Sequence, residues 1–250
     1  MTLRLPLLPT DPRAPFPDPR AALRVPDGLL AMGGDLSPPR LLNAYRHGIF
    51  PWYSDGEPLL WWCPDPRTVF RTDAVRLSAR FRRSLRKSDW IVRADTAFAE
   101  VIDACAHLPR GGQVGTWITD EMRDAYLELH RLGHAHSIEV FDADELVGGL
   151  YGVAIGRMFF GESMVSIRSG GSKVALAALC SRLHQWGWPL LDAQVENPHL
   201  LSLGAELWPR ERFLAAIAEL VAEPVHAGAW NTAFGEYPVR RLAGSHAPDV

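Results

Sequence analysis

The sequence contains little cysteine: Cys63, Cys105 and Cys180 are its only thiols, and they are far apart. An odd number of widely spaced cysteines is not typical of a disulfide framework or of a zinc ribbon. Long apolar runs are also missing, since none approaches the roughly 18 to 20 residues that span a bilayer. Pro6 and Pro9 interrupt the apolar residues at the start, which is not typical of a signal peptide. We therefore expect a cytoplasmic protein that does not enter a membrane.

An excess of charge of one sign is absent as well. Lysine and arginine number 26 and aspartate and glutamate number 29, which gives a formal net charge of −3. This balance excludes a globally basic nucleic-acid-binding protein but allows a local cationic surface. Apolar residues make up 47% of the 250 residues, which is typical of an ordered globular protein with one large domain, or one large and one small.

The pattern of the sequence changes near residue 65. Residues 1–65 are rich in Pro, Gly and Trp and predict a small N-terminal domain with one short helix, capped by Ser37 and ending at His47. The segments then become longer, so we expect a larger domain over residues 66–250. Its expected elements are helices over 121–132, 172–186 and 209–221 and strands over 135–141, 146–155, 158–164 and 189–195. This order predicts an α+β or mixed α/β fold.

A cationic segment over residues 76–87 contains six basic residues and no acid: Arg76, Arg80, Arg82, Arg83, Arg86 and Lys87. On a helix these side chains gather on the outer face, opposite an inward arc of Leu77, Phe81 and Leu85. Such a face can simply be solvated. Six like charges repel one another, however, and a polyanion that neutralises them removes the repulsion. RNA phosphate is the natural candidate for that partner.

Three polar side chains interrupt apolar sequence further along the chain. Asp192 and Gln194 stand in the strand LLDAQV, and their spacing of two predicts that they share one face. Glu162 stands in FFGES, where a buried carboxylate has to be hydrogen-bonded, paired or functional. Each feature has two interpretations: an ordinary solvent-facing residue, or part of a site.

Other patterns point to fewer functions. His130, His134 and His136 lack the spacing of helical metal ligands, so we expect no metal. No G-x-S-x-G motif or reactive cysteine motif indicates a covalent nucleophile. The Gly-rich turn over 167–173 precedes a helix and can bind an anion, but Lys173 occupies the last position of the acyl-CoA pyrophosphate pattern. An acyl-CoA-dependent N-acyltransferase remains an alternative.

Longer motifs follow one another along most of the chain: GLLAMGGDLSP (28–38), YRHGIFPWY (45–53), LLWWCPDPR (59–67), GTWI (115–118), GHAHSIEV (133–140), LVGGLYG (146–152), FFGESM (159–164) and SLGAE (202–206). Their sequences and their order resemble those of the bacterial leucyl/phenylalanyl-tRNA–protein transferase family. Cys63, Val165 and Gly171 depart from the family's pattern, where Ser, a larger residue and Ala are expected. These departures bear on the preference between leucine and phenylalanine.

The resemblance implies a small N-terminal domain followed by a C-terminal domain similar to the GNAT acetyltransferase fold. It also implies that Asp192, Gln194 and Glu162 are catalytic and that the cationic segment binds tRNA. The residues implied for the aminoacyl pocket are Trp52, Leu150, Phe159 and Met164. The implied reaction moves leucine or phenylalanine, and as a further donor methionine, from an aminoacyl-tRNA to the N-terminal amine of proteins that begin with Lys or Arg, marking them for degradation.

An aminoacyl ester is already activated, so the reaction needs no cofactor, only positioning and proton transfer. The acceptor amine has a pKa of about 7.7 to 8.0, so the site has to favour its neutral form. The carbonyl of Gln194 can accept a hydrogen bond from the attacking nitrogen, with Asp192 orienting that amide and taking a proton through it. Glu162 suits the acceptor's amine or its basic side chain. A non-catalytic tRNA-binding module is the alternative from another class, and a monomer is expected.

Overall fold

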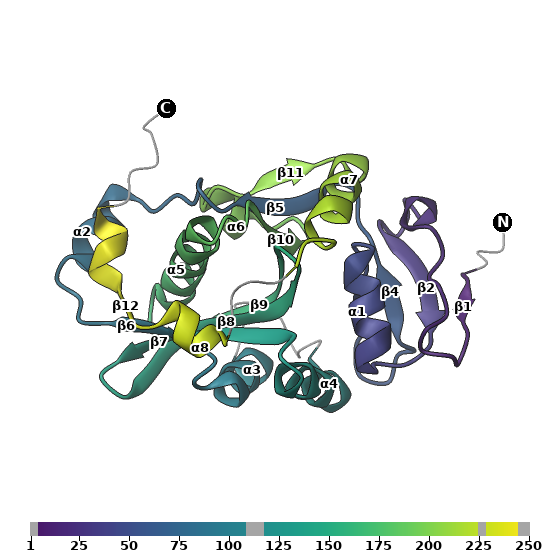
Figure 1. Ribbon diagram of the computed structural model, residues 1–250, viewed down its shortest axis with the longest axis horizontal. Helices are drawn as coiled ribbons and strands as arrows, with labels where there is room; N and C mark the ends of the chain where they lie inside the picture. The colour runs from purple at the N-terminus through teal and green to yellow at the C-terminus, as the bar shows by residue number, and fades with distance from the viewer. Residues whose placement is uncertain (1–4, 109–117, 225–228, 245–250) are drawn as a thin grey trace.

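The computed structural model describes residues 5–108, 118–224 and 229–244. Within these residues the strands form two sheets (Figure 1). The small sheet has the order β1-β2-β4-β3 and the large mixed sheet the order β11-β5-β10-β9-β8-β7-β6-β12. Both sheets lie with helices around them, so the mixed α/β class and the small N-terminal part are confirmed.

The small sheet contains β1 (Leu7–Leu8), β2 (Leu29–Gly33), β3 (Phe50–Pro51) and β4 (Leu60–Trp62). The large sheet contains β5 (Arg67–Arg71), β6 (Ile91–Ala94), β7 (Ala135–Asp142), β8 (Glu145–Ile155), β9 (Met158–Ser166), β10 (Leu190–Gln194), β11 (Glu206–Trp208) and β12 (Tyr237–Pro238). The helices are α1 (Pro38–Arg46), α2 (Ala79–Leu85), α3 (Phe98–His107), α4 (Asp120–Arg131), α5 (Gly171–Gln185), α6 (Pro198–Ser202), α7 (Arg210–Leu220) and α8 (Trp230–Phe234), with 3-10 turns η1 (Pro19–Ala21) and η2 (Val239–Ala243).

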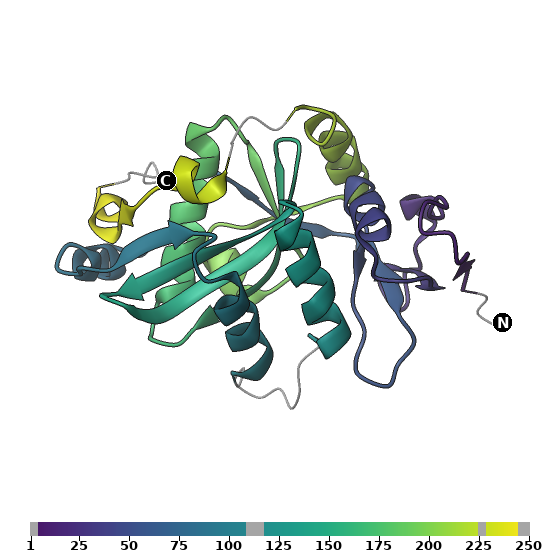
Figure 2. The same ribbon diagram turned by 60° about the horizontal axis from the view of Figure 1, so that its bottom comes forward.

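Helices cover both faces of the large sheet (Figure 2). The helices α3 and α4 pack on one face together with α1, and their apolar side chains share a core with Trp61 of the small sheet and Phe213 of α7. The buried helix α5 packs on the other face, where its side chains share a second core with α8 and η2. The central strands β7 and β8 are therefore buried on both sides, and β7 buries His136, Ser137 and Glu139 together with its apolar residues.

The most periodic segments are confirmed. Helices α1, α4, α5 and α7 and strands β7, β8, β9 and β10 end within one or two residues of the expected limits. Clear start and stop signals account for this agreement, since the Thr119 side chain caps α4 and Gly133 and Gly187, both with positive φ, follow α4 and α5.

Three expectations about the elements need correction. The helix expected over 76–87 covers only Ala79–Leu85, because Ser78 caps it and the residues before Ser78 run beside α6. Helix α8 and the 3-10 turn η2 follow α7, and the sequence pattern predicts neither of them. The N-terminal part contains short strands as well as one helix. Its boundary near residue 65 stays a prediction.

In the part of the chain that the structure describes, no helix combines the length and the apolar character needed to cross a bilayer.

Candidate active site

The site begins where two strands of the large sheet part. Strands β9 and β10 are parallel, and their pairing ends at Phe160 and Asp192. Strand β9 continues to Ser166 and pairs there only with β8. Glu162 and Gln194 come just after this point, and Nε2 of Gln194 donates a hydrogen bond to Oε1 of Glu162 at 2.6 Å. These two side chains therefore bridge the diverging strands.

An apolar pocket of about 240 Å³ opens beside this bridge. Its lining residues are Phe70, Leu150, Tyr151, Phe159, Gly161, Glu162, Ser163, Met164, Leu176, Leu191, Ala193, Asn197 and Leu200. Strands β5, β8, β9 and β10 supply most of them, and α5 and α6 supply the others. A mostly apolar cavity with a few convergent polar groups is the usual form of a small-ligand site.

The structure brings three of the four expected pocket residues together. Leu150, Phe159 and Met164 line the cavity. Trp52 does not: its side chain is 41% exposed and its ring lies 5.5 Å from that of Trp62, in the small sheet. The prediction of an aminoacyl contact for Trp52 is not supported by this geometry.

The backbone at the end of β10 is irregular. Asp192 lies opposite Val69 and Gln194 opposite Thr68, so a bulge inserts Ala193 between them. The bulge breaks the regular alternation of side chains at this end of β10. The side chain of Gln194 still reaches Glu162, so the expectation that Asp192 and Gln194 share one face stays a prediction.

Gln194 has a φ of +60°, which costs a non-glycine residue of order 1 to 3 kcal/mol. Two hydrogen bonds hold it there: its backbone N–H donates to Oδ1 of Asp192 at 2.9 Å, and its side chain donates to Glu162. With Nε2 committed to Glu162, Oε1 of Gln194 has no hydrogen-bond partner among the described residues. That oxygen is available as an acceptor.

Glu162 accepts hydrogen bonds from three elements. The hydroxyls of Tyr45 and Tyr126 donate to it at 2.7 and 2.8 Å, and Gln194 donates the third. Burial raises the pKa of Glu162 to about 7, and the negative charge of Asp192 acts in the same direction, while the three donors lower it. Glu162 therefore changes its protonation state near neutral pH.

The two tyrosines are fixed donors. Burial, together with the charge of Glu162, raises the pKa of both Tyr45 and Tyr126 well above the ordinary value, and their hydroxyls also contact one another. Tyr45 belongs to α1 and Tyr126 to α4, so Glu162 joins the N-terminal part of the chain to the large sheet.

Asp192 is paired away from the pocket. Nε and Nη2 of Arg67 donate to its two carboxylate oxygens at 2.8 and 2.7 Å, and both side chains are fully buried. Nη1 of Arg67 donates to the carbonyl oxygen of Gly48, and the guanidinium lies between the rings of Phe50 and Phe213 at 4.8 and 4.6 Å. A bidentate pair held this firmly orients its neighbours more readily than it exchanges a proton.

The cationic segment lies at one end of the molecule, beside η2 and the start of α5 (Figure 1). Five of its six basic side chains are exposed and Arg82 is half-buried. Leu85 is buried and Phe81 packs near Gly170 at the start of α5. The expected division into an outer cationic face and an inner apolar arc is confirmed.

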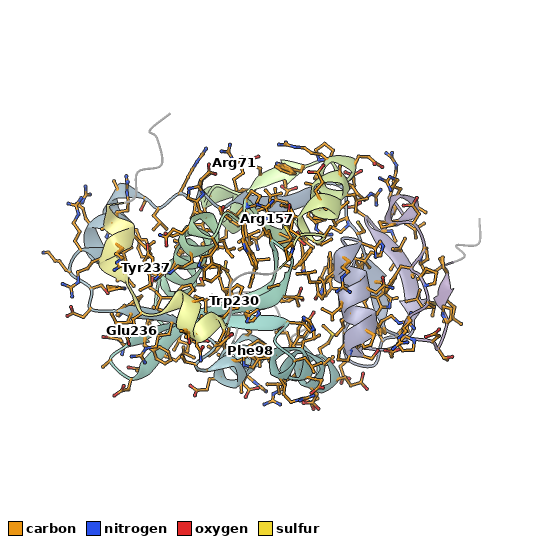
Figure 3. All side chains as sticks on the ribbon, viewed as in Figure 1. Arg71, Phe98, Arg157, Trp230, Glu236 and Tyr237 are labelled. Carbon is orange, nitrogen blue, oxygen red and sulfur yellow. The ribbon has the colours of Figure 1, made fainter. Side chains whose placement is uncertain are left out.

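Two of the histidines, His130 on α4 and His136 on β7, lie beside Asp95 in a separate polar network. Nδ1 of His136 lies 2.7 Å from Oδ2 of Asp95, and Nδ1 of His130 lies 3.8 Å from the other oxygen. The ring of His136 stacks on Trp230 of α8 and that of His130 on Phe98 of α3, two residues that Figure 3 labels. Within the described ranges, no group of three His, Cys, Asp or Glu side chains is arranged to hold a metal ion.

The Gly-rich turn before α5 already uses two of its amides. The N–H of Gly171 donates to the carbonyl oxygen of Arg168 and that of Ser172 to Oγ of Ser166. A pyrophosphate would have to compete with these bonds, which counts against the acyl-CoA alternative. The departure at Gly171 has a steric reason here, since a Cβ atom would lie 2.3 Å from the carbonyl oxygen of Val147.

A mixed α/β fold with an apolar pocket, a carboxyl of near-neutral pKa and an open amide oxygen is the arrangement of an enzyme that acts on an apolar group and transfers a proton. Comparison with known proteins gives the family. The family model for leucyl/phenylalanyl-tRNA protein transferase matches residues 69–218, and the model for the N-terminal domain of that protein matches residues 34–65.

Curated relatives agree with these matches. A leucyl/phenylalanyl-tRNA–protein transferase of Xanthomonas axonopodis pv. citri is 67% identical over 94% of this chain and 95% of its own length. The corresponding protein of Xylella fastidiosa is 62% identical over 94% of this chain and 97% of its own length. The chain belongs to the leucyl/phenylalanyl-tRNA protein transferase family. The expectation of an enzyme, an aminoacyltransferase, is confirmed.

Similar solved structures are distant. A conserved protein from Staphylococcus epidermidis has a TM-score of 0.40 at 9% identity and covers 72% of this chain and 68% of its own. A GCN5-related N-acetyltransferase-like protein from Streptococcus suis has a TM-score of 0.28 at 14% identity and covers 64% of this chain and 59% of its own. Scores this low carry no argument about the site.

Sequence reasoning missed three residues of the network: Arg67, Tyr45 and Tyr126. Arg67 ends the motif LLWWCPDPR and Tyr45 begins YRHGIFPWY, so both stood in segments that resemble the family. Tyr126 stands in none of the motifs. Its position on the buried stripe of α4 is the one signal that separates it from the exposed residues of that helix.

Proposed function

We propose that this enzyme transfers leucine or phenylalanine from an aminoacyl-tRNA to the N-terminal amine of proteins that begin with Lys or Arg, marking them for degradation. The observation that carries the proposal is the apolar pocket bounded by Glu162 beside Gln194. The pocket suits an apolar side chain, and the polar groups stand where the ester attached to it can meet an amine. The family of the chain supports the same reaction.

The residues support a direct attack without a covalent enzyme intermediate. The neutral amine attacks the ester carbonyl carbon, a carbon–nitrogen bond forms, and the bond from that carbon to the ribose oxygen breaks. Oε1 of Gln194 accepts a hydrogen bond from the attacking nitrogen. The carboxylate of Glu162 takes the proton that the nitrogen loses, and that proton leaves with the ribose oxygen. A pKa of about 7 suits a group that gains and loses a proton near neutral pH.

Asp192 acts in this proposal as a positioning residue. Its Oδ1 atom holds the backbone N–H of Gln194, and its pair with Arg67 is saturated by two hydrogen bonds. The contact runs through the backbone of Gln194 and not through its side-chain amide, so a proton relay from that amide to Asp192 has no support. The work of the buried pair is to keep Gln194 in its left-handed conformation.

The pocket sets the donor preference. Leu150, Phe159 and Met164 surround the cavity, and a change of one methylene there alters binding by about 1 to 3 kcal/mol. Gly161 also lines the cavity. We expect the shape of the pocket to reject side chains that branch at Cβ.

The cationic segment supplies the tRNA contacts. Arg76, Arg80, Arg83, Arg86 and Lys87 are exposed, so their charges can reach phosphates of the donor. Arg82 lies beside them in the same segment. The binding energy of these contacts is sequence-independent and decreases with salt, which suits an enzyme that accepts charged tRNAs of different sequence.

One assay tests the proposal against its alternatives. Radiolabelled leucyl-tRNA is mixed with the protein and with peptides that begin with Lys, Arg or Ala. We expect label to appear on the Lys and Arg peptides and not on the Ala peptide. Binding of the tRNA without any transfer indicates a non-catalytic module, and saturable transfer from acetyl-CoA indicates an acyl-CoA enzyme; either result contradicts the proposal.

A further inference from the structure

A cation lies between the cationic segment and the pocket. Lys173 is in the first turn of α5, and its Nζ lies 5.8 Å from the ring centroid of Phe81 on α2. Leu176, three residues further on and on the same side of α5, lines the pocket. Lys173 therefore stands at the junction of α2 with the pocket rim.

A second polar group comes from α6. His199 is exposed and lies between Asn197 and Leu200, which both line the pocket. Partial burial and the positive charge of Lys173 lower the pKa of His199. Leu176 of α5 and Leu200 of α6 line the same pocket, so the helices that carry Lys173 and His199 meet at its rim.

A third cation, Arg76, lies next to the residues that follow α6. Its backbone N–H donates to the carbonyl oxygen of Leu203 at 2.8 Å, and its side chain lies beside Gly204, directly after α6. None of Arg76, Lys173 and His199 forms an ion pair with an acid in the parts of the chain that the structure describes. Cations that have no acidic partner attract phosphate groups.

We propose that Lys173, with His199 and Arg76 on either side, binds the 3′-terminal phosphodiester of the aminoacyl-tRNA. This inference rests on the proposed function. With the aminoacyl group in the pocket, the phosphate of the terminal nucleotide lies one nucleoside away from the ester, at the rim where Leu176, Asn197 and Leu200 end. Lysine binds phosphate as a point charge. The other basic residues of the cationic segment then bind phosphates further from the ester.

Three leucyl donor substrates distinguish binding of the terminal phosphate by Lys173 from a general loss of tRNA binding. Leucyl-adenosine carries no phosphate, the dinucleotide cytidylyl-(3′–5′)-leucyl-adenosine carries one, and leucyl-tRNA carries all of them. For Lys173→Gln we expect KM to rise about fivefold to tenfold for the dinucleotide and for the tRNA, with kcat retained. The rise should be confined to donors with a phosphate, and Lys173→Arg should restore KM.

Salt dependence gives a second measurement. One phosphate contact on a single strand contributes a slope of about 0.7 in the plot of log affinity against log salt. We expect Lys173→Gln to lower the slope for the dinucleotide by about that amount. His199→Gln should give a smaller rise in KM than Lys173→Gln, because a neutral imidazole supplies a hydrogen bond and no full charge.

Arg131→Gln is the matched control, because Arg131 is an exposed cation on α4 that pairs with Glu128. It should leave KM unchanged for every donor. An unchanged KM of Lys173→Gln for the dinucleotide, or an equal rise for leucyl-adenosine, overturns the proposal. If the wild-type enzyme transfers leucine from none of the donors, the proposed function itself fails and the phosphate site fails with it.

Discussion

Glu162 on β9 and Glu139 on β7 are both carboxylates within the large sheet, and burial raises the pKa of each. Glu139 is fully buried and accepts hydrogen bonds from Thr96 and from Ser137. Glu162 accepts its hydrogen bonds from three separate elements and faces the pocket. A raised pKa is therefore shared by both regions, and access to a cavity distinguishes them.

The donors differ in origin as well. Ser137 is two residues from Glu139 on the same strand, and Thr96 stands in the turn after the neighbouring strand β6. This network is local and fits a structural role. The donors of Glu162 come from α1, α4 and β10, so its network forms only when distant parts of the chain have packed together. A buried carboxylate indicates an active site when it combines such convergence with a pocket.

Glu162→Gln should have the largest effect on activity. The amide cannot take a proton from the acceptor amine, so we expect the transfer rate to fall by about 10² to 10⁴. Single-turnover transfer of labelled leucine measures the rate, and filter binding of leucyl-tRNA should show an affinity within about threefold of the wild type. A rate within fivefold of the wild type would remove Glu162 from the chemistry.

Asp192→Asn should have the next largest effect. It leaves the guanidinium of Arg67 buried without its counter-ion, which costs about 3 to 5 kcal/mol of stability. The asparagine amide keeps one acceptor oxygen, but its NH2 group faces a guanidinium N–H of Arg67, so the side chain shifts and holds the backbone N–H of Gln194 less firmly. We therefore expect kcat to fall by at least tenfold. Urea unfolding measures the stability, and kcat is measured below the onset of unfolding.

A double variant distinguishes the stability effect of the buried charges from the effect of Asp192 on the position of Gln194. Arg67→Met combined with Asp192→Leu fills the same space without a buried ion pair and should recover most of the stability. It should not recover kcat, because no acceptor remains for the N–H of Gln194. Recovery of kcat together with stability contradicts the positioning role of Asp192.

The pH dependence of transfer should also separate the two carboxylates. The reaction needs Glu162 ionised and the amine neutral, so ionisation of Glu162 alone should contribute about a tenfold rise in rate for each pH unit below its pKa, near 7. Titration of the free amine, with a pKa of about 7.7 to 8.0, adds a second rise. Rates measured from pH 5.5 to 9 test this. Glu162→Gln should lose the first rise and keep the second, and Glu139→Gln should keep both.

Stability should respond to pH in the opposite direction. The folded pKa of Glu162 lies above the unfolded value of about 4.5, so its protonated form stabilises the fold below that value and the contribution is lost as pH rises through about 7. The loss is roughly 3 kcal/mol for a shift of this size. Urea unfolding at pH 5 and at pH 8 should show this loss in the wild type and a smaller one in Glu162→Gln.

Much of the fold could be predicted from the sequence where the pattern was local. Helix α4 has a capping threonine and the meander of β7, β8 and β9 has alternating segments with turn residues between them. Helix α3 was missed because Ala97 at its N-cap supplies no side-chain hydrogen bond. The strands of the N-terminal part are only two to five residues long and exist through pairing across the small sheet.

The candidate site was predictable in part. Asp192, Gln194 and Glu162 were found because each is a polar residue in an apolar strand. The bulge at Ala193 could not be found, since nothing in DAQ requires the positive φ of Gln194. The partner of Asp192 could not be found either, because Arg67 is 125 residues away and becomes buried only between two aromatic rings from other elements.

Glu139→Gln should have the smallest effect on activity. It tests whether Glu139, unlike Glu162, has only a structural role. The amide has nearly the same shape, and it leaves the pocket and its polar groups untouched. The NH2 group of the glutamine now donates where a carboxylate oxygen accepted a hydrogen bond from Thr96 or Ser137. We therefore expect the free energy of unfolding to fall by about 1 to 2 kcal/mol, because one buried hydrogen bond is mismatched. Measured at 25 °C on protein shown to be folded, kcat and KM should stay within about threefold of the wild type. A loss comparable to that of Glu162→Gln would mean that burial and a raised pKa, without access to the pocket, are enough to make a carboxylate essential.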